Sequence, residues 1–309
     1  MQTFPKSSAP DRFVRQEGIV GPELHEALAR SSVFLPGLGA IGSATLTALA
    51  RTGIGRFVLI DDDEIGYENF SSQLFASEQT VHAGKVRTAK RFVQAIHPEC
   101  SIETLPVTCD VDRLAEVIAA VDVVVLGMDT LSGGIACCRA ARIASRPVVD
   151  FLYFPTVNVL STLPGWSVPE ERFGYPTRGL RPEECDAPAI AAESLLRVVA
   201  YGFCCNEGLL EAIGPRHRQA LGSFLRMEAQ IPSFAPMTMQ VGAMMAGQAV
   251  SLIAHSKGLP HVPLAWPGFY IDHYRLRSAV PAHESLSEMP GHRATLEALT
   301  HLRDSVGGS

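Results

Sequence analysis

Three glycines with a spacing suited to phosphate binding, Gly37, Gly39 and Gly42, lie near the start of the chain. They follow a short apolar stretch and open a helical pattern. In a βαβ unit the first glycine permits a tight turn, the second lets a phosphate approach the backbone, and the third lets the helix pack against the strand. The helix start also offers free N–H groups and a positive dipole end. The spacing therefore predicts a nucleotide-binding turn, and a glycine-rich turn without a ligand is the alternative.

Two aspartates, Asp61 and Asp63, directly follow the next apolar stretch, residues 57–60. An acidic residue about 20 positions after such glycines commonly binds the ribose hydroxyls of a nucleotide. The acidic run 61–64 is also typical of a solvated loop. Because Asp61 and Asp63 come directly after a strand, we expect both to belong to the nucleotide site.

A lysine and a third aspartate have positions that suit phosphoryl chemistry. Lys85 lies where a helical pattern begins, and a cation there could neutralise charge that develops on a transferring phosphate. Taken alone, it could equally be a solvated surface lysine. Asp129 follows the apolar stretch 121–126, and α/β sheets bind ligands at the carboxyl ends of their strands. Its carboxylate could hold Mg²⁺, or it could cap a helix that begins near Ser132.

The elements that must position these residues alternate between strands and helices. Such alternation predicts right-handed βαβ crossovers and an α/β fold with a doubly wound, mostly parallel, Rossmann-like sheet. The continuous apolar character of 121–126 is typical of a strand buried inside such a sheet. The predicted strands are 33–35, 57–60, 102–106, 121–126 and 147–151, and the predicted helices are 40–50, 82–96 and 135–145.

The alternation changes after residue 155, and we expect a C-terminal mixed part of helices and antiparallel strands continuous with the sheet. Its expected elements are a strand at 157–163, a flexible Pro- and Gly-rich segment at 164–188, long helices at 189–213 and 238–255, and an edge strand at 269–276. The predicted organisation is an N-terminal helical arm (1–30), a nucleotide-binding part (31–155), a C-terminal mixed part (156–278) and a polar, partly disordered tail (279–309).

Composition excludes several classes of function. The formal net charge of −6 offers no electrostatic case for nucleic acid or an anionic membrane, and any nucleic-acid footprint would have to be small and local. Seven cysteines with no Cys-x-x-Cys suit a reducing cytoplasm, and no signal peptide is apparent. Two uncharged stretches, 31–50 and 229–254, contain glycines and prolines, so we expect buried elements rather than membrane spans.

Six motifs in order resemble the ThiF/MoeB family of adenylyltransferases, relatives of the ubiquitin-activating enzymes. Together they span almost the whole chain, and each is weak alone. They are Arg12-Phe13-Val14-Arg15-Gln16, Leu59-Ile60-Asp61-Asp62-Asp63, Asn69 with Gly84-Lys85, Gly127-Met128-Asp129, the Pro-rich helix entry at 236–249, and Tyr270-Ile271-Asp272.

The resemblance implies a role for each matching residue. Asp61 would bind ribose, Lys85 and Asn69 would contact phosphates, Asp129 would hold Mg²⁺, and Arg15 would reach the phosphates of the neighbouring subunit in a homodimer. The implied reaction is attack of a carboxylate on the α-phosphate of ATP, giving an acyl-adenylate and pyrophosphate. The implied substrate is the C-terminus of a ubiquitin-like sulfur-carrier protein or of a peptide.

Three departures mark the chain as a divergent member. Ser72 stands where the family usually has an arginine three positions after Asn69, and Arg87 or Lys90 is the candidate replacement. The zinc-binding Cys-x-x-Cys pairs of many relatives are missing, so no structural zinc is predicted. Cys185 is the loop cysteine nearest the position of a transfer nucleophile, but the acids beside it would raise its pKa and disfavour that role.

Two other functions stay open at the level of the sequence. An NAD-dependent oxidoreductase would explain the glycines and Asp61, but it leaves Arg15, Lys85 and Asp129 without a role. A catalytically inactive binding or scaffold protein on the same fold is compatible with Ser72.

Overall fold

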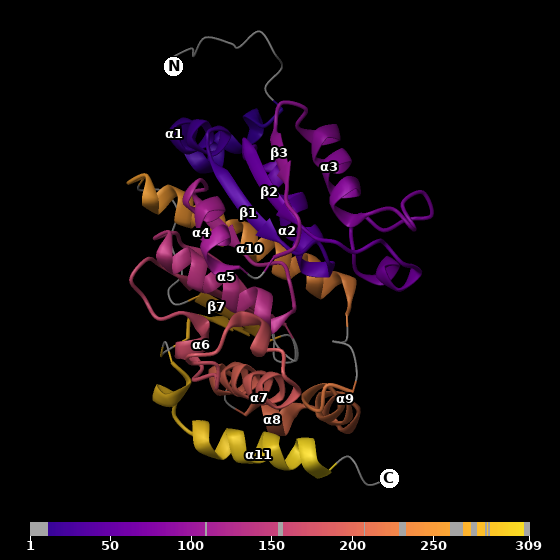
Figure 1. The fold of residues 1–309 in the computed structure, drawn as a ribbon, viewed down its shortest axis with the longest axis vertical. Coiled ribbons are helices and arrows are strands. Elements are labelled where there is room, and N and C mark those ends of the chain that lie inside the picture. The colour runs from indigo at the N-terminus through magenta and orange to yellow at the C-terminus, as the bar shows by residue number, and fades with distance from the viewer. Residues whose placement is uncertain are drawn as a thin grey trace.

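The computed structural model describes residues 12–108, 110–153, 157–206, 208–228, 233–259, 268–272, 277–281, 283 and 285–305. Its centre is one eight-stranded sheet in the order β3-β2-β1-β4-β5-β6-β7-β8. Figure 1 shows β3, β2 and β1 side by side. The strands of the parallel part are β1 (Ser32–Pro36), β2 (Arg56–Ile60), β3 (Ser101–Thr104), β4 (Val123–Val125) and β5 (Val148–Tyr153). The predicted doubly wound, Rossmann-like α/β fold is therefore confirmed.

Alternate side chains of the parallel strands enter two apolar clusters, one on each face of the sheet. Phe57 and Leu59 of β2 join the cluster that includes the helices α2 and α3, whereas Val58 joins the cluster of α4 and α5. This alternation follows from the period of two in a strand, and both faces are covered, which explains the continuous apolar character of the strands. The helices are α2 (Ala40–Arg51), α3 (Lys85–Ile96), α4 (Val111–Ala119) and α5 (Leu131–Ile143).

Strand order reverses at β1, which pairs in parallel with β2 on one side and β4 on the other. Open α/β sheets bind ligands at such a switch point, beyond the carboxyl ends of the strands. Here the turn after β1 and the segment after β4 meet at that point. The topology therefore places the glycine turn and the Gly127–Asp129 segment at one edge of the sheet.

Antiparallel strands extend the sheet beyond β5. They are β6 (Val157–Thr162), β7 (Gly268–Asp272) and β8 (Arg277–Ala279). The predicted strand at 269–276 is therefore only partly right. Its first half is β7, which lies between β6 and β8 rather than at the edge, and residues 273–276 lie outside the described residues.

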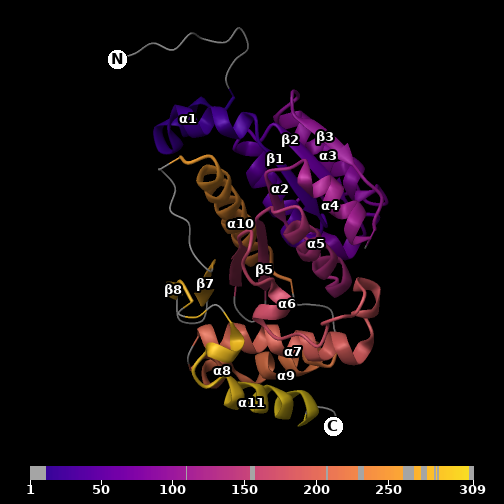
Figure 2. The same ribbon diagram turned by 60° about the vertical axis from the view of Figure 1, so that its left-hand side comes forward.

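The long helix α10 (Ala235–Ser256) crosses α2 at very close range (Figure 2). A methyl group at Gly242 would lie 2.4 Å from the Cβ atom of Ala44, so only glycine allows this approach. By length and composition alone, α10 and α7 (Pro188–Cys205) could cross a membrane, a property that core helices share. Within the apolar window of α10, 67% of the residues are buried inside the protein.

The single helix predicted at 189–213 is wrong, because α7 ends at Cys205 and a short α8 (Leu209–Ala212) follows. Gly208 adopts a left-handed conformation with φ of 74°, which a continuous helix cannot contain. The other helices of this part are α6 (Pro169–Arg172) and α9 (Pro215–Leu225), with 3-10 turns η3 (Pro182–Glu184) and η4 (Leu286–Glu288).

The predicted disordered tail contains a helix, α11 (His292–Ser305). It packs against α7 and α9, and Leu299 is fully buried there. Its polar residues cover the outer side of an amphipathic helix, which explains why composition alone indicated a solvated tail. Figure 2 shows α7, α9 and α11 gathered at the end of the molecule away from α3.

The segment predicted to be flexible, 164–188, is docked along α5. Arg139 of α5 binds the Glu170 carboxylate and the carbonyl oxygens of Thr177 and Leu180, and Arg142 pairs with Glu171.

The N-terminal part of the described chain consists of η1 (Val14–Gln16) and α1 (Glu17–Ala29), which is kinked at Gly21.

Candidate functional site

The glycine turn is defined by contacts among three glycines. Gly37 has a φ of +86°, and a methyl group there would lie 2.5 Å from the carbonyl carbon of Gly127. A methyl group at Gly42 would lie 2.0 Å from the oxygen of Gly37. Gly39, in contrast, has no heavy atom within 4 Å of its Cβ position. The turn is therefore closely packed on its inner side and open at Gly39, where α2 begins.

The open position has the properties of a phosphate site. Gly39 is the N-cap of α2, and no side chain caps that end of the helix. The first N–H groups of a helix have no partner within the helix, and its dipole favours an anion at this end. The predicted roles of Gly37, Gly39 and Gly42 fit this geometry. Gly127, which the sequence motifs did not assign to the site, packs against Gly37 and closes the inner side of the turn.

Asp61 connects the end of β2 to the glycine turn. Its Oδ2 atom accepts a hydrogen bond from the Leu38 amide at 2.6 Å, and its Oδ1 atom accepts one from the Asp63 amide at 3.0 Å. Burial raises the pKa of Asp61 above its ordinary value, although both hydrogen bonds and the charge of Lys85 act in the opposite direction. A carboxylate can accept further bonds, so this one could still bind a ribose hydroxyl.

Lys85 faces the same end of the sheet and is nearly buried. Its Nζ atom lies 2.6 Å from Oδ2 of Asp63, with 8% of the lysine side chain exposed against 68% for the aspartate. The backbone supports this pair, since the Lys85 amide donates to the Asp63 carbonyl oxygen at 2.9 Å. Lys85 is thus a cation held inward at the start of α3, with a partner that solvent can reach.

Asp61, Asp62 and Asp63 also form the one group of carboxylates, within the described ranges, whose oxygens lie close enough to share a cation. One oxygen from each lies within 4.8 Å of the others. Asp63 is already paired with Lys85, so a divalent ion would compete with that lysine. This geometry makes the run less suited to Mg²⁺ than three adjacent acids suggest.

Asp129 lies beyond β4, beside the glycine contact. Gly127 and Met128 touch Gly37, and Asp129 is the next residue along the chain. Its side chain is exposed and forms no hydrogen bond or ion pair with any described residue. The N-cap of the following helix is Thr130, so Asp129 does not serve as the cap. An exposed, unpaired carboxylate at this point fits the predicted Mg²⁺ ligand.

A carboxylate from the segment docked on α5 accepts a hydrogen bond from a backbone amide at the start of that helix. Asp186, at the end of the segment docked on α5, accepts a hydrogen bond from the Ser132 amide at 3.0 Å. The neighbouring Cys185 is fully buried, and burial raises the pKa of its thiol. A buried, protonated thiol is a poor nucleophile, which agrees with the expectation from its acidic neighbours.

Asn69 lies in the 3-10 turn η2 (Tyr67–Ser71), where its Oδ1 atom accepts a hydrogen bond from the Gly66 amide at 3.0 Å. The acceptor side of the amide is thus used locally, and the Nδ2 group forms no bond with a described residue. Ser72, at the position of the family arginine, is buried. The proposed replacements lie elsewhere: Arg87 is exposed on the face of α3 opposite to Lys85, and Lys90 lies on that same outer side.

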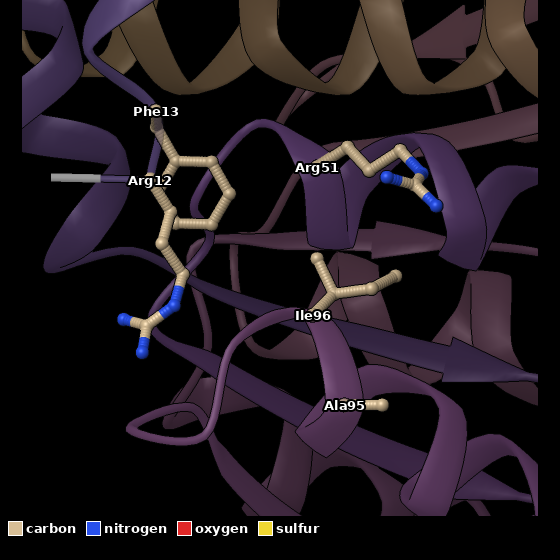
Figure 3. Close-up of a pocket in the computed structure, with 5 residues that line it drawn as sticks. All are labelled: Arg12, Phe13, Arg51, Ala95 and Ile96. Carbon is tan, nitrogen blue, oxygen red and sulfur yellow. The ribbon is translucent and has the colours of Figure 1, made fainter. Parts of the chain in front are cut away.

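Arg15 is not brought to this site within one chain. The arm that carries it packs at the other end of α2, where the Phe13 ring covers Gly53 and meets His97 edge to face at 5.2 Å. A hollow of about 430 Å³ lies beside Phe13, lined by Arg12, Phe13, Arg51, Ala95 and Ile96. Figure 3 shows these five side chains. The length of α2, about 18 Å, separates this region from the glycine turn.

The family model for the ThiF family matches residues 13–264. The chain belongs to the ThiF family. Membership implies that ATP binds to this Rossmann-like fold, which fits the open turn at Gly39 and the inward cation of Lys85. The NAD-dependent oxidoreductase is therefore the weaker of the alternatives left by the sequence.

The curated relatives of this ThiF-family chain include proteins named as a dehydratase, an activating enzyme and an adenylyltransferase. A Bacillus subtilis tRNA threonylcarbamoyladenosine dehydratase is 39% identical over 94 residues, which is 30% of this chain and 37% of the relative. The SAMP-activating enzyme E1 of Haloferax volcanii is 34% identical over 144 residues, 47% of this chain and 53% of the relative. A sulfur carrier protein adenylyltransferase of Thermus thermophilus is 30% identical over 141 residues, 45% of this chain and 52% of the relative. The matches thus span about a third to a half of each relative.

Solved structures extend the likeness of fold to most of the ThiF-family chain. PaaA matches with a TM-score of 0.61 and 19% identity, over 90% of this chain and 84% of that one. The Escherichia coli MccB structure with ATP matches with a TM-score of 0.60 and 19% identity, over 89% of this chain and 72% of that one. At this level of identity the likeness concerns the fold alone.

Proposed function

We propose that the protein is an ATP-dependent adenylyltransferase that activates a carboxylate as an acyl-adenylate and releases pyrophosphate. The observation that carries this proposal is the link between the open turn at Gly39 and the nearly buried cation of Lys85. Lys85 pairs with Asp63, the Asp63 amide donates to Asp61, and Asp61 accepts a hydrogen bond from Leu38 in the turn. The turn and the cation are both needed to hold a triphosphate whose leaving group gains negative charge.

Each residue has a proposed role in that reaction. The amides at the start of α2 bind phosphate oxygens, and Asp61 binds the ribose. Lys85 exchanges Asp63 for a phosphate and stabilises charge as the bond to pyrophosphate breaks. Asp129 and the phosphates would hold Mg²⁺, which supplies further charge neutralisation. Asn69 contributes its Nδ2 group to the phosphates.

The proposed substrate is the C-terminus of a ubiquitin-like sulfur-carrier protein or of a peptide. The names of the Haloferax and Thermus relatives support the first, and the fold of MccB, solved with N-formylated MccA, agrees with the second. A tRNA-borne substrate is the competing possibility, because one relative is named as a tRNA-modifying dehydratase. We further propose a cytoplasmic homodimer in which Arg15 reaches the phosphates of the second copy.

Calorimetric titration tests the first step of the proposal. ATP with Mg²⁺ should bind the wild type, whereas NAD should not. Lys85→Ala and Asp129→Ala should each weaken ATP binding by about tenfold or more, as expected for a lost charge-assisted contact. Lys257→Ala is a matched control, since it removes a lysine paired with Asp122 far from the glycine turn.

The outcomes separate the candidate functions. Binding of NAD without ATP would favour the oxidoreductase. Binding of neither nucleotide would favour a scaffold protein. If ATP binds, pyrophosphate exchange with carrier proteins and peptides identifies the class of carboxylate.

A further inference from the structure

Helix α3 has one face that the proposed reaction does not use. Its inner face carries Lys85, Thr88, Ala89 and Val93, all buried. Three cations lie on the outer face, namely Arg87, Lys90 and Arg91, of which Arg87 and Arg91 are exposed and Lys90 is partly buried. The helix contains no acidic residue, although the chain as a whole has a net charge of −6.

None of these three cations forms an ion pair or hydrogen bond with a described residue. Other arginines near the same edge of the sheet do: Arg12 pairs with Glu99, and Arg56 pairs with Glu103. Like charges three and four residues apart on a helix destabilise it slightly. These three cations therefore do not stabilise the folded chain, and their charges are available to a binding partner.

Exposed aromatic rings lie at the N-terminal end of the same helix. Tyr67 is 60% exposed and Phe70 is 37% exposed, and their ring centroids are 5.4 Å apart. The Tyr67 ring also meets that of His82 at 6.2 Å. Backbone bonds tie this turn to the start of α3, because the His82 amide donates to the Ile65 carbonyl oxygen at 2.8 Å and a bridge joins Glu64 to Gly84.

The charges around the rings decide which class of partner fits. Asp62, Glu64 and Glu68 are exposed on the loop that carries Tyr67 and Phe70. They would repel the phosphates of a nucleic acid that lay across the whole surface. Exposed aromatic residues beside arginines are instead characteristic of protein–protein interfaces.

We infer that this surface docks the folded body of a substrate protein whose acidic patch faces Arg87, Lys90 and Arg91 of α3 and whose apolar surface covers Tyr67 and Phe70. This inference rests on the proposed function and narrows it, since a short peptide could not cover the surface. Asn69 belongs to the same 3-10 turn as Tyr67 and Phe70, and Lys85 lies on the inner face of α3. A body docked here could deliver its C-terminal tail to the glycine turn nearby.

Binding of an acidic ubiquitin-like sulfur-carrier protein, measured by calorimetry without ATP, tests the inference. Arg87→Glu with Arg91→Glu should weaken binding by about tenfold or more, as for arginines at an interface centre. Added salt should reduce the difference, because the contact is exposed. The matched control, Arg216→Glu with Arg293→Glu, makes the same change of charge on α9 and α11, at the far end of the molecule (Figure 1), and should leave binding unchanged.

Pyrophosphate exchange provides the second readout. The α3 variant should raise the KM of the carrier protein without changing kcat, and should leave the KM of a short peptide from its tail unchanged. If the carrier binds through α3 but no exchange occurs with either substrate, the proposed function fails and the docking surface stands.

The inference would be overturned by any of these results: no binding of the carrier by the wild type, equal effects of the α3 and control variants, or equal effects on carrier and tail peptide. Binding of bulk tRNA that depends on Arg87 and Arg91, with carrier binding unaffected, would assign the face to nucleic acid and also overturn it.

Discussion

Gly39 and Gly42 respond in opposite ways to an added methyl group. Gly42→Ala places a carbon 2.0 Å from the Gly37 oxygen, and the backbone must move to relieve the clash. We expect a loss of about 1–3 kcal/mol in the free energy of unfolding, measured by urea denaturation. Gly39→Ala meets open space and should cost less than about 1 kcal/mol, yet weaken ATP binding in calorimetry. Equal destabilisation by both changes would contradict the described turn.

Asp150 on β5 predicts a pH dependence of stability. Burial raises its pKa from 3.8 to about 6, against the opposing hydrogen bond from Phe151 and the charge of Arg172. Because the folded state binds this proton more tightly, the carboxyl destabilises the fold as pH rises from about 4 to about 6. Between about pH 4 and about pH 6, the free energy of unfolding of the wild type should fall by up to about 3 kcal/mol relative to that of Asp150→Asn.

Urea unfolding of both proteins at several pH values measures this difference. If the difference in free energy of unfolding between the wild type and Asp150→Asn stayed constant across this pH range, the carboxyl would not titrate there.

At the scale of elements, α5 holds the segment 164–188 through Arg139. That side chain pairs with Glu170 at 3.1 Å and donates to the Leu180 oxygen at 2.6 Å. Arg139→Ala removes the donor from these partly buried acceptors. We therefore expect the free energy of unfolding to fall by about 2–4 kcal/mol and tryptic cleavage within the segment to become faster. Arg30→Ala, which removes an exposed pair with Glu26, is the control and should cost less than about 1 kcal/mol.

At the scale of the whole molecule, the position of Arg15 predicts complementation between chains. Arg15→Ala and Lys85→Ala should each be inactive, because each lacks one part of every site. In an equal mixture, half of the dimers pair the two variants, and one of their two sites has both Arg15 and Lys85. Exchange activity should therefore recover to about a quarter of the wild-type value. No recovery in a mixture shown by sedimentation to exchange subunits would place Arg15 outside the site.

Local sequence patterns determined much of this protein by themselves. The apolar strands, the helix after Gly42 and the spacing of Gly37, Gly39 and Asp61 depend on neighbours along the chain, so the first βαβ unit and its glycine turn could be predicted. The contact of Gly37 with Gly127, the pairing of Lys85 with Asp63 and the docking of α11 were decided only by tertiary structure. They join residues distant in sequence, and their energies depend on distances that composition and periodicity do not contain. The same reason separates Arg15 from Lys85: a motif shows order along the chain, whereas the packing of Phe13 on Gly53 decides at which end of the sheet the arm lies.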